Sequence, residues 1–391
     1  MRPIVCLLVL LAIGASVRAA AAGQILIAPG DQWSKQAQQM RAGDELILMP
    51  GRHRPGKLAE LVGTADRPII IRGLSTEKPA IIAADRDGIL LRDVRHIVIK
   101  DLFIEGARIN GISVRTSGDP DAPPVPTNIT IRGVHIRHTG PTGRRHGIQI
   151  ERADGVRIRE CTLEGWGGSG IDIVSCTDVR VDGCRFLSAP NHGQDAAMSF
   201  RGRTEDIEIL RCSVEDAGTW GIVLGGPRDA TLDDVGGATD PDAVREHSVR
   251  DIMISSTLIR GTACPIHFRS VRDCTVRSVT FALPREYLLA VDLVDETEKI
   301  APSTDLRFTR NLVLWQDGTL KSLAVRGKIA DPDAIGVGEN LWWTTSGPAD
   351  LDSVGGLPGV ETFPQRTTLD PKLDDRFRAS VSEARVFGVT R

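Results

Sequence analysis

The feature that most constrains this chain is a repeat of short strand-like segments. A Gly-Ile-x-apolar pattern, or a close variant of it, returns about every 23 residues, and longer intervals mark insertions. Its copies are GILL from Gly88, GISV from Gly111, GIQI from Gly147, GIDI from Gly170, AMSF from Ala197, GIVL from Gly221 and PIHF from Pro265. Self-similarity at so short a period predicts a solenoid in which each copy stacks on its neighbours.

A second pattern lies between the copies of the first. It begins with Asp, Asn, His or Gly and continues as apolar-x-apolar. A two-residue corner follows, and after it comes another residue whose side chain points into the coil. Its copies are HIVIKDLFI from His96, NITIRGVHI from Asn128, GVRIRECTL from Gly155, DVRVDGCRF from Asp178, DIEILRCSV from Asp206, DIMISSTLI from Asp251, DCTVRSVTF from Asp273 and DLRFTRNLV from Asp305. Such strands bury a face only by stacking about 4.8 Å apart. The patterns predict a parallel β-helix; the alternative, an antiparallel sandwich, needs regular hairpin turns.

The corner of the second pattern carries cysteine in three successive repeats, at Cys161, Cys184 and Cys212. Parallel Cβ vectors in equivalent conformations hold the β-carbons too far apart for a disulfide, so we expect a buried ladder of thiols. The sequence does not decide whether three further cysteines form disulfides: Cys176, Cys264 and Cys274.

From about residue 69 to residue 313 the repeat resembles the right-handed parallel β-helix of the pectate-lyase-like superfamily. The segment before it, from AGDELILMPGRHRPG through GTADRPIIIRG and AIIAA, is similar to the N-terminal region of polysaccharide lyase family six, the alginate lyase and chondroitinase B group. We therefore expect an all-β, right-handed solenoid. Residues 23–84 would form its N-terminal cap and first coils, 85–313 the repeats, and 314–391 an irregular C-terminal cap.

The first 22 residues predict export. Met1-Arg2-Pro3 precede an apolar run from Ile4 to Ile13 and small residues up to Ala22, which is typical of a secretory signal peptide; a short membrane anchor is the alternative. We expect a secreted or periplasmic protein that begins between Ala20 and Gln24, has no membrane partner and is a monomer. The balance of 48 Lys and Arg against 51 Asp and Glu, a formal net charge of -3, argues against a nucleic-acid partner.

Alternation along the Gly-Ile-x-apolar strands assigns the side chains that point out of the coil. One outward row contains Leu90, Ser113, Gln149, Asp172, Ser199, Val223 and His267, and the next contains Arg92, Arg115, Glu151, Val174, Arg201, Gly225 and Arg269. In the superfamily that the chain resembles, substrate lies along this face. The candidate catalytic residues are Arg201, Asp172, Asp195, His192, His146 and Glu151, and the candidate substrate-binding residues are Arg115, Gln149, Ser199, Trp220 and His267. The alternative is that these polar side chains only solvate an exposed sheet.

Two insertions follow strands of this face, TSGDPDAPPVPT after Arg115 and an acidic, Gly-rich run over residues 225–247. Long loops on a rigid scaffold often carry function, so we expect them to form walls beside the central coils. The acidic run offers oxygen ligands for calcium, although their spacing matches no known calcium loop and a solvated loop is the simpler interpretation. These residues are Asp229, Asp233, Asp234, Asp240 and Asp242.

Resemblance to two groups of enzymes indicates different reactions. Glycosidases of polygalacturonan carry Asn-Thr-Asp-Gly-Ile-Asp-Ile, Asp-Asp-Cys-Ile-Ala-Ile and Gly-His-Gly-Ile on successive coils. Here Ser169, Ala196 and Trp220 stand at three of the expected polar positions, and Asp195 keeps one expected carboxylate. Family-six lyases use a Lys base, and no Lys lies between Lys100 and Lys299.

Elimination from a uronate needs a neutralised carboxylate, a base at C5 and a proton for the leaving oxygen. Arg201 and Arg115 could neutralise, and His192 or His146 could act as the base. Asp195 or Glu151 could hold the histidine or a metal. The leading hypothesis is a secreted polysaccharide lyase acting on an acidic polysaccharide. The alternatives are a glycoside hydrolase using Glu151, Asp172 and Asp195, and a non-catalytic glycan-binding or cell-surface solenoid.

Overall fold

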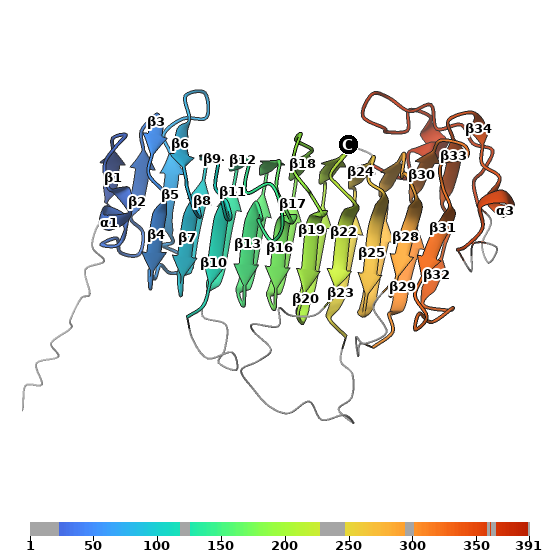
Figure 1. Cartoon of the computed structure of the whole chain (residues 1–391), viewed down its shortest axis with the longest axis horizontal. Helices are drawn as coiled ribbons and strands as arrows, with labels where there is room; N and C mark the ends of the chain where they lie inside the picture. Colours follow the sequence, from blue (N-terminus) through green and yellow to red (C-terminus); the bar gives the residue numbers. More distant parts are fainter. Residues whose placement is uncertain are drawn as a thin grey trace, which may run out of the picture.

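The computed structural model describes residues 23–117, 126–226, 247–293, 301–357, 360 and 365–389. Short strands in these ranges form three sheets, A, B and C, in which neighbouring strands are parallel except for one pair at the C-terminal end (Figure 1). Between the two ends of the solenoid, each turn of the chain adds one strand to sheet A, then to sheet B, then to sheet C. The predicted parallel β-helix is therefore confirmed, and the antiparallel sandwich is excluded. The predicted signal peptide lies outside the described residues. No helix in the described ranges is long and apolar enough to cross a membrane.

Sheet A consists of β1 (Gln24–Ile27), β2 (Glu45–Leu48), β5 (Ile69–Gly73), β8 (Arg95–Lys100), β11 (Thr127–Arg132), β14 (Asp154–Arg159), β17 (Thr177–Asp182), β20 (Thr204–Leu210), β23 (Val249–Ser255), β26 (Val271–Arg277), β29 (Thr304–Thr309) and β32 (Ile335–Val337). Sheet B consists of β3 (Gly51–His53), β6 (Ala80–Ala83), β9 (Phe103–Glu105), β12 (His135–Arg137), β15 (Thr162–Glu164), β18 (Arg185–Leu187), β21 (Ser213–Glu215), β24 (Leu258–Arg260), β27 (Thr280–Ala282), β30 (Leu312–Trp315), β33 (Leu341–Thr344) and β34 (Gly347–Pro348). Sheet C consists of β4 (Gly56–Ala59), β7 (Ile89–Arg92), β10 (Ile112–Arg115), β13 (Ile148–Glu151), β16 (Ser169–Val174), β19 (Ala196–Arg201), β22 (Trp220–Gly225), β25 (Cys264–Arg269), β28 (Tyr287–Val291) and β31 (Ser322–Arg326). The described helices are short: α1 (Trp33–Ala37), α3 (Leu351–Val354) and the 3-10 turn η1 (Ser382–Ala384).

The first position of the second sequence pattern bends the chain at the start of each sheet A strand. Every copy there adopts a left-handed backbone conformation, with φ between 51° at Asp178 and 71° at Gly155. Asp, Asn and Gly reach this region at lower cost than other residues, because Gly has no Cβ and short polar side chains bond to the local backbone. This requirement explains why the pattern begins with those residue types.

The glycine of the Gly-Ile-x-apolar pattern meets a different requirement. A Cβ at Gly147 would lie 2.6 Å from the carbonyl oxygen of Gly170 in the next coil, and a Cβ at Gly170 would lie 2.7 Å from that of Ala197. Side-chain carbons do not approach a carbonyl so closely. Glycine therefore sets the corner between sheets B and C, where successive coils touch through their backbones.

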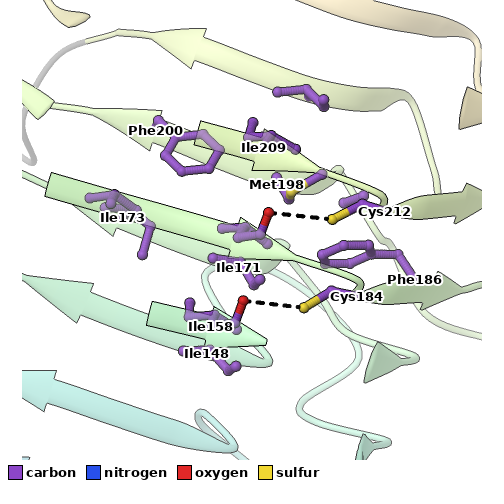
Figure 2. Close-up of a cluster of buried hydrophobic side chains, with 14 of the residues drawn as sticks. Ile148, Ile158, Ile171, Ile173, Cys184, Phe186, Met198, Phe200, Ile209 and Cys212 are labelled. Carbon is purple, nitrogen blue, oxygen red and sulfur yellow. Dashed lines mark hydrogen bonds between the residues drawn. The ribbon is translucent and has the colours of Figure 1, made fainter. Parts of the chain in front are cut away.

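Inward side chains of the three sheets fill a continuous apolar column. Figure 2 shows its central part, where Ile148, Ile171 and Met198 stack in successive coils. The predicted thiol ladder is part of this column, and each cysteine sulfur faces a backbone carbonyl of the preceding coil. The Sγ of Cys184 lies 3.6 Å from the oxygen of Ile158. All six described cysteines are unpaired and buried, so the bridge left open for Cys264 and Cys274 does not form.

The strand ladder continues beyond residue 313, where the sequence repeats fade. Strands β31, β32 and β33 add a further coil. The tail then turns back beside sheet B (Figure 1). The Gly388 amide donates to the Arg310 carbonyl, and the Val389 amide donates to the Thr280 hydroxyl. Phe387 and Ala384 pack on Leu312 in a second small apolar cluster.

Candidate functional site

A large cleft lies on sheet C. It has a volume of about 990 Å³ and extends over coils β16 to β31. Its polar and aromatic lining is Arg144, His146, Ser169, Asp172, Asp195, Ser199, Arg201, Trp220, His267, Arg269, Arg326 and Lys328. We call it the sheet C cleft. Seven of the eleven residues that the sequence predicts for the site line it.

The register of sheet C confirms the predicted outward row. Asp172 pairs with Gln149 on one side and with Ser199 on the other, and Val223 pairs with His267 further along. The outward direction does not make Asp172 accessible to solvent, however, because the residue is only 1% exposed. Asp172 therefore points outward as predicted, but neighbouring side chains such as Arg201 and His146 cover it.

A buried ion pair stands at the centre of the sheet C cleft. The guanidinium of Arg201 donates from Nε to Asp172 Oδ1 at 3.1 Å and from Nη2 to Oδ2 at 2.9 Å, a bidentate geometry. Burial alone would raise the pKa of Asp172, but His146 and Arg201 outweigh it and hold that pKa below its ordinary value. Asp172 thus stays ionised and fixes the direction of Arg201.

His146 supports this pair from the other side. Its Nδ1 accepts the backbone N–H of Ser169 at 3.1 Å, so the proton of the neutral ring lies on Nε2, which is 3.7 Å from Asp172 Oδ2. Burial lowers the pKa of His146. Because Nε2 is shielded from solvent and faces Asp172, His146 is a positioning residue, and its predicted role as the base is not supported by this geometry.

Asp195 is the carboxylate that the sheet C cleft presents to a ligand. It precedes β19, it is exposed, and no side-chain hydrogen bond or ion pair is found for it among the described residues. Partial desolvation raises its pKa, and His146 opposes the shift only in part. A carboxylate that is both reachable and more basic than usual suits proton transfer.

Trp220 and His267 form an aromatic platform in the same cleft. Their ring centroids lie 4.5 Å apart at an interplanar angle of 31°. Burial, with a smaller contribution from Arg269, lowers the pKa of His267 to about 3, so this ring is neutral at physiological pH. An aromatic surface beside cations suits the apolar face of a sugar that also carries an acid group.

Four cations of the sheet C cleft were not among the predicted site residues: Arg144, Arg269, Arg326 and Lys328. Arg269 ends β25 in the second outward row, so alternation gave a usable signal for it. Arg326 and Lys328 belong to the coil of β31, beyond the point where the repeat can be read from the sequence. Counting coils from the segment SLAVR, residues 322–326, would have been needed to find them.

The remaining predicted residues lie outside the sheet C cleft. Gln149 is buried, and its Oε1 accepts from Asn110 at 2.9 Å and from Arg115 at 3.1 Å. Glu151 belongs to the same neighbouring coil of β13. His192 lines a separate shallow depression and stacks on His138, with ring centroids 5.6 Å apart. These four predicted residues therefore do not line the sheet C cleft together with Arg201.

The described lining does not fit calcium. Only two of its side chains are carboxylates, one of them already bound by Arg201, whereas calcium takes six to eight oxygen ligands. No cluster of three metal-ligating side chains occurs anywhere in the described ranges. The acidic run that was considered for calcium, from Asp229 to Asp242, lies outside the described residues.

Comparisons with known proteins agree with this architecture. The family model described as "Right handed beta helix region" matches residues 87–233. The fold is a right-handed parallel β-helix. Among solved structures, a rhamnogalacturonan lyase matches with a TM-score of 0.53 at 13% identity, over 95% of this chain and 100% of that chain. Both matches concern the fold, and they confirm the predicted handedness.

Other polysaccharide lyases match less closely. An alginate lyase from Paenibacillus sp. str. FPU-7 has a TM-score of 0.41 at 14% identity, over 79% of this chain and 97% of that chain. A lyase of polysaccharide lyase family six from Pseudopedobacter saltans has a TM-score of 0.45 at 10% identity, over 94% and 99%. A comparison with curated protein sequences gives no significant match.

Proposed function

We propose that this protein is a secreted, monomeric polysaccharide lyase that cleaves an acidic polysaccharide in the sheet C cleft by β-elimination. The observation that carries the proposal is the charge of the lining. Five Arg and Lys side chains face two carboxylates, and Asp172 is already neutralised by Arg201. Because the whole chain carries a formal net charge of -3, this positive charge is local to the cleft. The polysaccharide lyases with a similar fold support the choice of ligand class.

The lining offers a group for each step of an elimination. The excess positive charge of the lining neutralises the uronate carboxylate, with Arg201 held in a fixed direction by Asp172, and so stabilises the charge that develops when the C5 proton leaves. Asp195 accepts that proton, since it is reachable and its pKa is raised. Lys328 supplies a proton to the leaving oxygen. The arginines of the lining cannot do so, because the pKa of a guanidinium is too high for it to release its proton.

Hydrolysis is less well supported by the same residues. Inverting and retaining glycosidases need two carboxyl groups that flank the scissile bond. Of the three carboxylates predicted for such a pair, Asp172 is buried in an ion pair and Glu151 lies outside the sheet C cleft. Asp195 alone among the three is an exposed carboxylate in the lining of the sheet C cleft.

Incubation with a panel of uronate and neutral polysaccharides tests the reaction type. We expect products with an unsaturated, ultraviolet-absorbing non-reducing end from a uronate polymer. Asp195→Asn is expected to lower kcat by about 10² to 10⁴ while the melting temperature changes little. Arg277→Ala, an exposed change on sheet A, is the control and should leave both quantities unchanged. Saturated reducing ends would indicate a hydrolase, and binding without products would indicate a non-catalytic solenoid.

Export and the monomeric state are tested separately. N-terminal sequencing of secreted or periplasmic material should give a start between Ala20 and Gln24. Material that still begins at Met1 would contradict the signal peptide. Sedimentation should give the mass of one chain.

A further inference from the structure

A second basic cleft lies on a different sheet, between sheet B and the returning C-terminal tail. It has a volume of about 520 Å³, and its walls come from the coils of β18, β21 and β24 and from the turn at residues 375–378. Its charged lining is Arg185, Arg211, Arg260, Arg376 and Arg378 together with Glu215 and Asp375. We call it the tail cleft, and we propose that it is a non-catalytic binding site for acidic polysaccharide.

Two of its arginines are available to a ligand. Arg211 and Arg378 are held by Asp182 and Asp374. By contrast, Arg185 and Arg376 are exposed and have no ion-pair partner among the described residues. Two unpaired guanidinium groups in one concave site suit carboxylate or sulfate groups, which they bind through paired N–H donors.

The tail turn that completes the cleft is held in a fixed conformation. Asp374 Oδ1 accepts the backbone N–H groups of Arg376 and Arg378, each at 2.9 Å, and Oδ2 accepts from Arg378 Nε at 2.8 Å. Phe377 adopts φ of 56°, a left-handed conformation that is unfavourable for a bulky residue. Such strain persists where surrounding contacts enforce it, and it is common at ligand-binding sites.

This conformation places an aromatic ring among the arginines. Phe377 is half-buried in the cleft wall, and the Arg260 guanidinium lies 5.3 Å from its ring centroid. A free inorganic anion would need the cations alone. A sugar that carries an acid group also uses the ring, because one face of a pyranose is apolar. The tail cleft therefore repeats, with different residues, the combination of cations and an aromatic ring found in the sheet C cleft.

The choice of polymer rests on the proposed function, whereas the binding site itself does not depend on cleavage. A long chain held in the tail cleft raises the local concentration of substrate near the sheet C cleft. Removing the tail cleft should then weaken binding of long polymer and leave turnover of short oligosaccharides unchanged.

The test compares two double variants in the cleavage-deficient Asp195→Asn background, with polygalacturonate and alginate as probes and dextran as the neutral control. Arg185→Gln/Arg376→Gln removes the two unpaired cations of the tail cleft. Arg277→Gln/Arg307→Gln removes two exposed arginines of sheet A that also lack an ion-pair partner among the described residues, and so it matches the loss of charge. Dissociation constants are measured by affinity electrophoresis. Turnover of short oligosaccharides is measured with the same two double variants made in a chain that keeps Asp195.

We expect the tail-cleft variant to raise the dissociation constant for an acidic polymer at least about tenfold and to leave oligosaccharide turnover unchanged. The sheet A variant should do neither. Equal binding by the two variants, or no binding of either acidic polymer by the native protein, would overturn the tail cleft as a site. If no polymer is cleaved, the binding comparison is made in the native background, so the two proposals fail separately.

Discussion

The two sides of strands β16 and β19 are almost equally buried, yet different forces stabilise them. The inward side consists of Ile171, Ile173 and Phe200 in an apolar column (Figure 2), where burial itself is favourable. The outward side holds Asp172 and Ser199, which are covered by loops and by Arg201. There, burial is unfavourable unless every charge is paired. Alternation along a strand thus predicts the direction of a side chain, whereas its exposure depends on what packs over it.

The largest effect is expected where a charge enters the inward side. Ile158→Asp or Val181→Asp should prevent folding, because an isolated carboxylate in the apolar column costs more than about 4 kcal/mol. Thr130→Asp is the matched control, since Thr130 points outward between two inward isoleucines of β11 and should fold. Circular dichroism and thermal melting decide the comparison. Cooperative folding of both inward variants would contradict the register.

A smaller effect is expected on the outward side. Asp172→Asn removes a buried counter-charge of the mostly buried Arg201, so we expect a loss of about 3 kcal/mol in the free energy of unfolding. Turnover should fall as well, because Arg201 is no longer held in place. Unfolding in urea and kcat are measured together on the same variant. An unchanged stability would mean that solvent reaches this pair and that the outward side behaves as an ordinary surface.

Acid should lower the free energy of unfolding through groups on the outward side of sheet C. The pKa of His267 is lowered to about 3 in the folded chain, so between pH 6.5 and about 3 the unfolded chain binds a proton that the folded chain does not. The free energy of unfolding should therefore decrease as the pH falls through that window, by about 1.4 kcal/mol per pH unit for one proton. Asp172 adds to the loss near and below its ordinary pKa, because its folded pKa is lowered.

His267→Gln separates this titration from packing. The variant should lose stability at neutral pH through the missing contact with Trp220, but its stability should depend less on pH between 6.5 and 4. The same dependence on pH in the variant and the native protein would assign the acid sensitivity to other groups.

The smallest effect is expected for the thiol ladder. Cys184→Ala should cost about 1 kcal/mol, because it removes one sulfur from a column that its neighbours still fill. A reducing agent should leave the melting temperature unchanged, since all six described cysteines are unpaired. Thiol reagents should react with the cysteines only after unfolding. A shift in melting temperature on reduction would reveal a disulfide.

The sequence by itself determined the coil and the direction of its side chains. The bend at Asp178 requires a residue that tolerates a left-handed backbone, and the contact at Gly170 requires a missing Cβ, so both local needs are visible in the pattern. The alternation that places Ile171 inward and Asp172 outward follows from strand geometry alone. Parallel stacking and the free thiol ladder follow from the same repeat.

Only the tertiary structure decided which side chains share a cleft. Lys328 and Arg326 reach the sheet C cleft from the coil of β31, because stacking brings together strands far apart in the chain. His192 precedes the same strand as Asp195 but lies outside the cleft, since loop conformation is not set by the repeat. The path of the tail back along sheet B, which forms the tail cleft, depends on contacts such as that of Phe387 with Leu312. These arrangements arise from long-range packing, and no local periodicity encodes them.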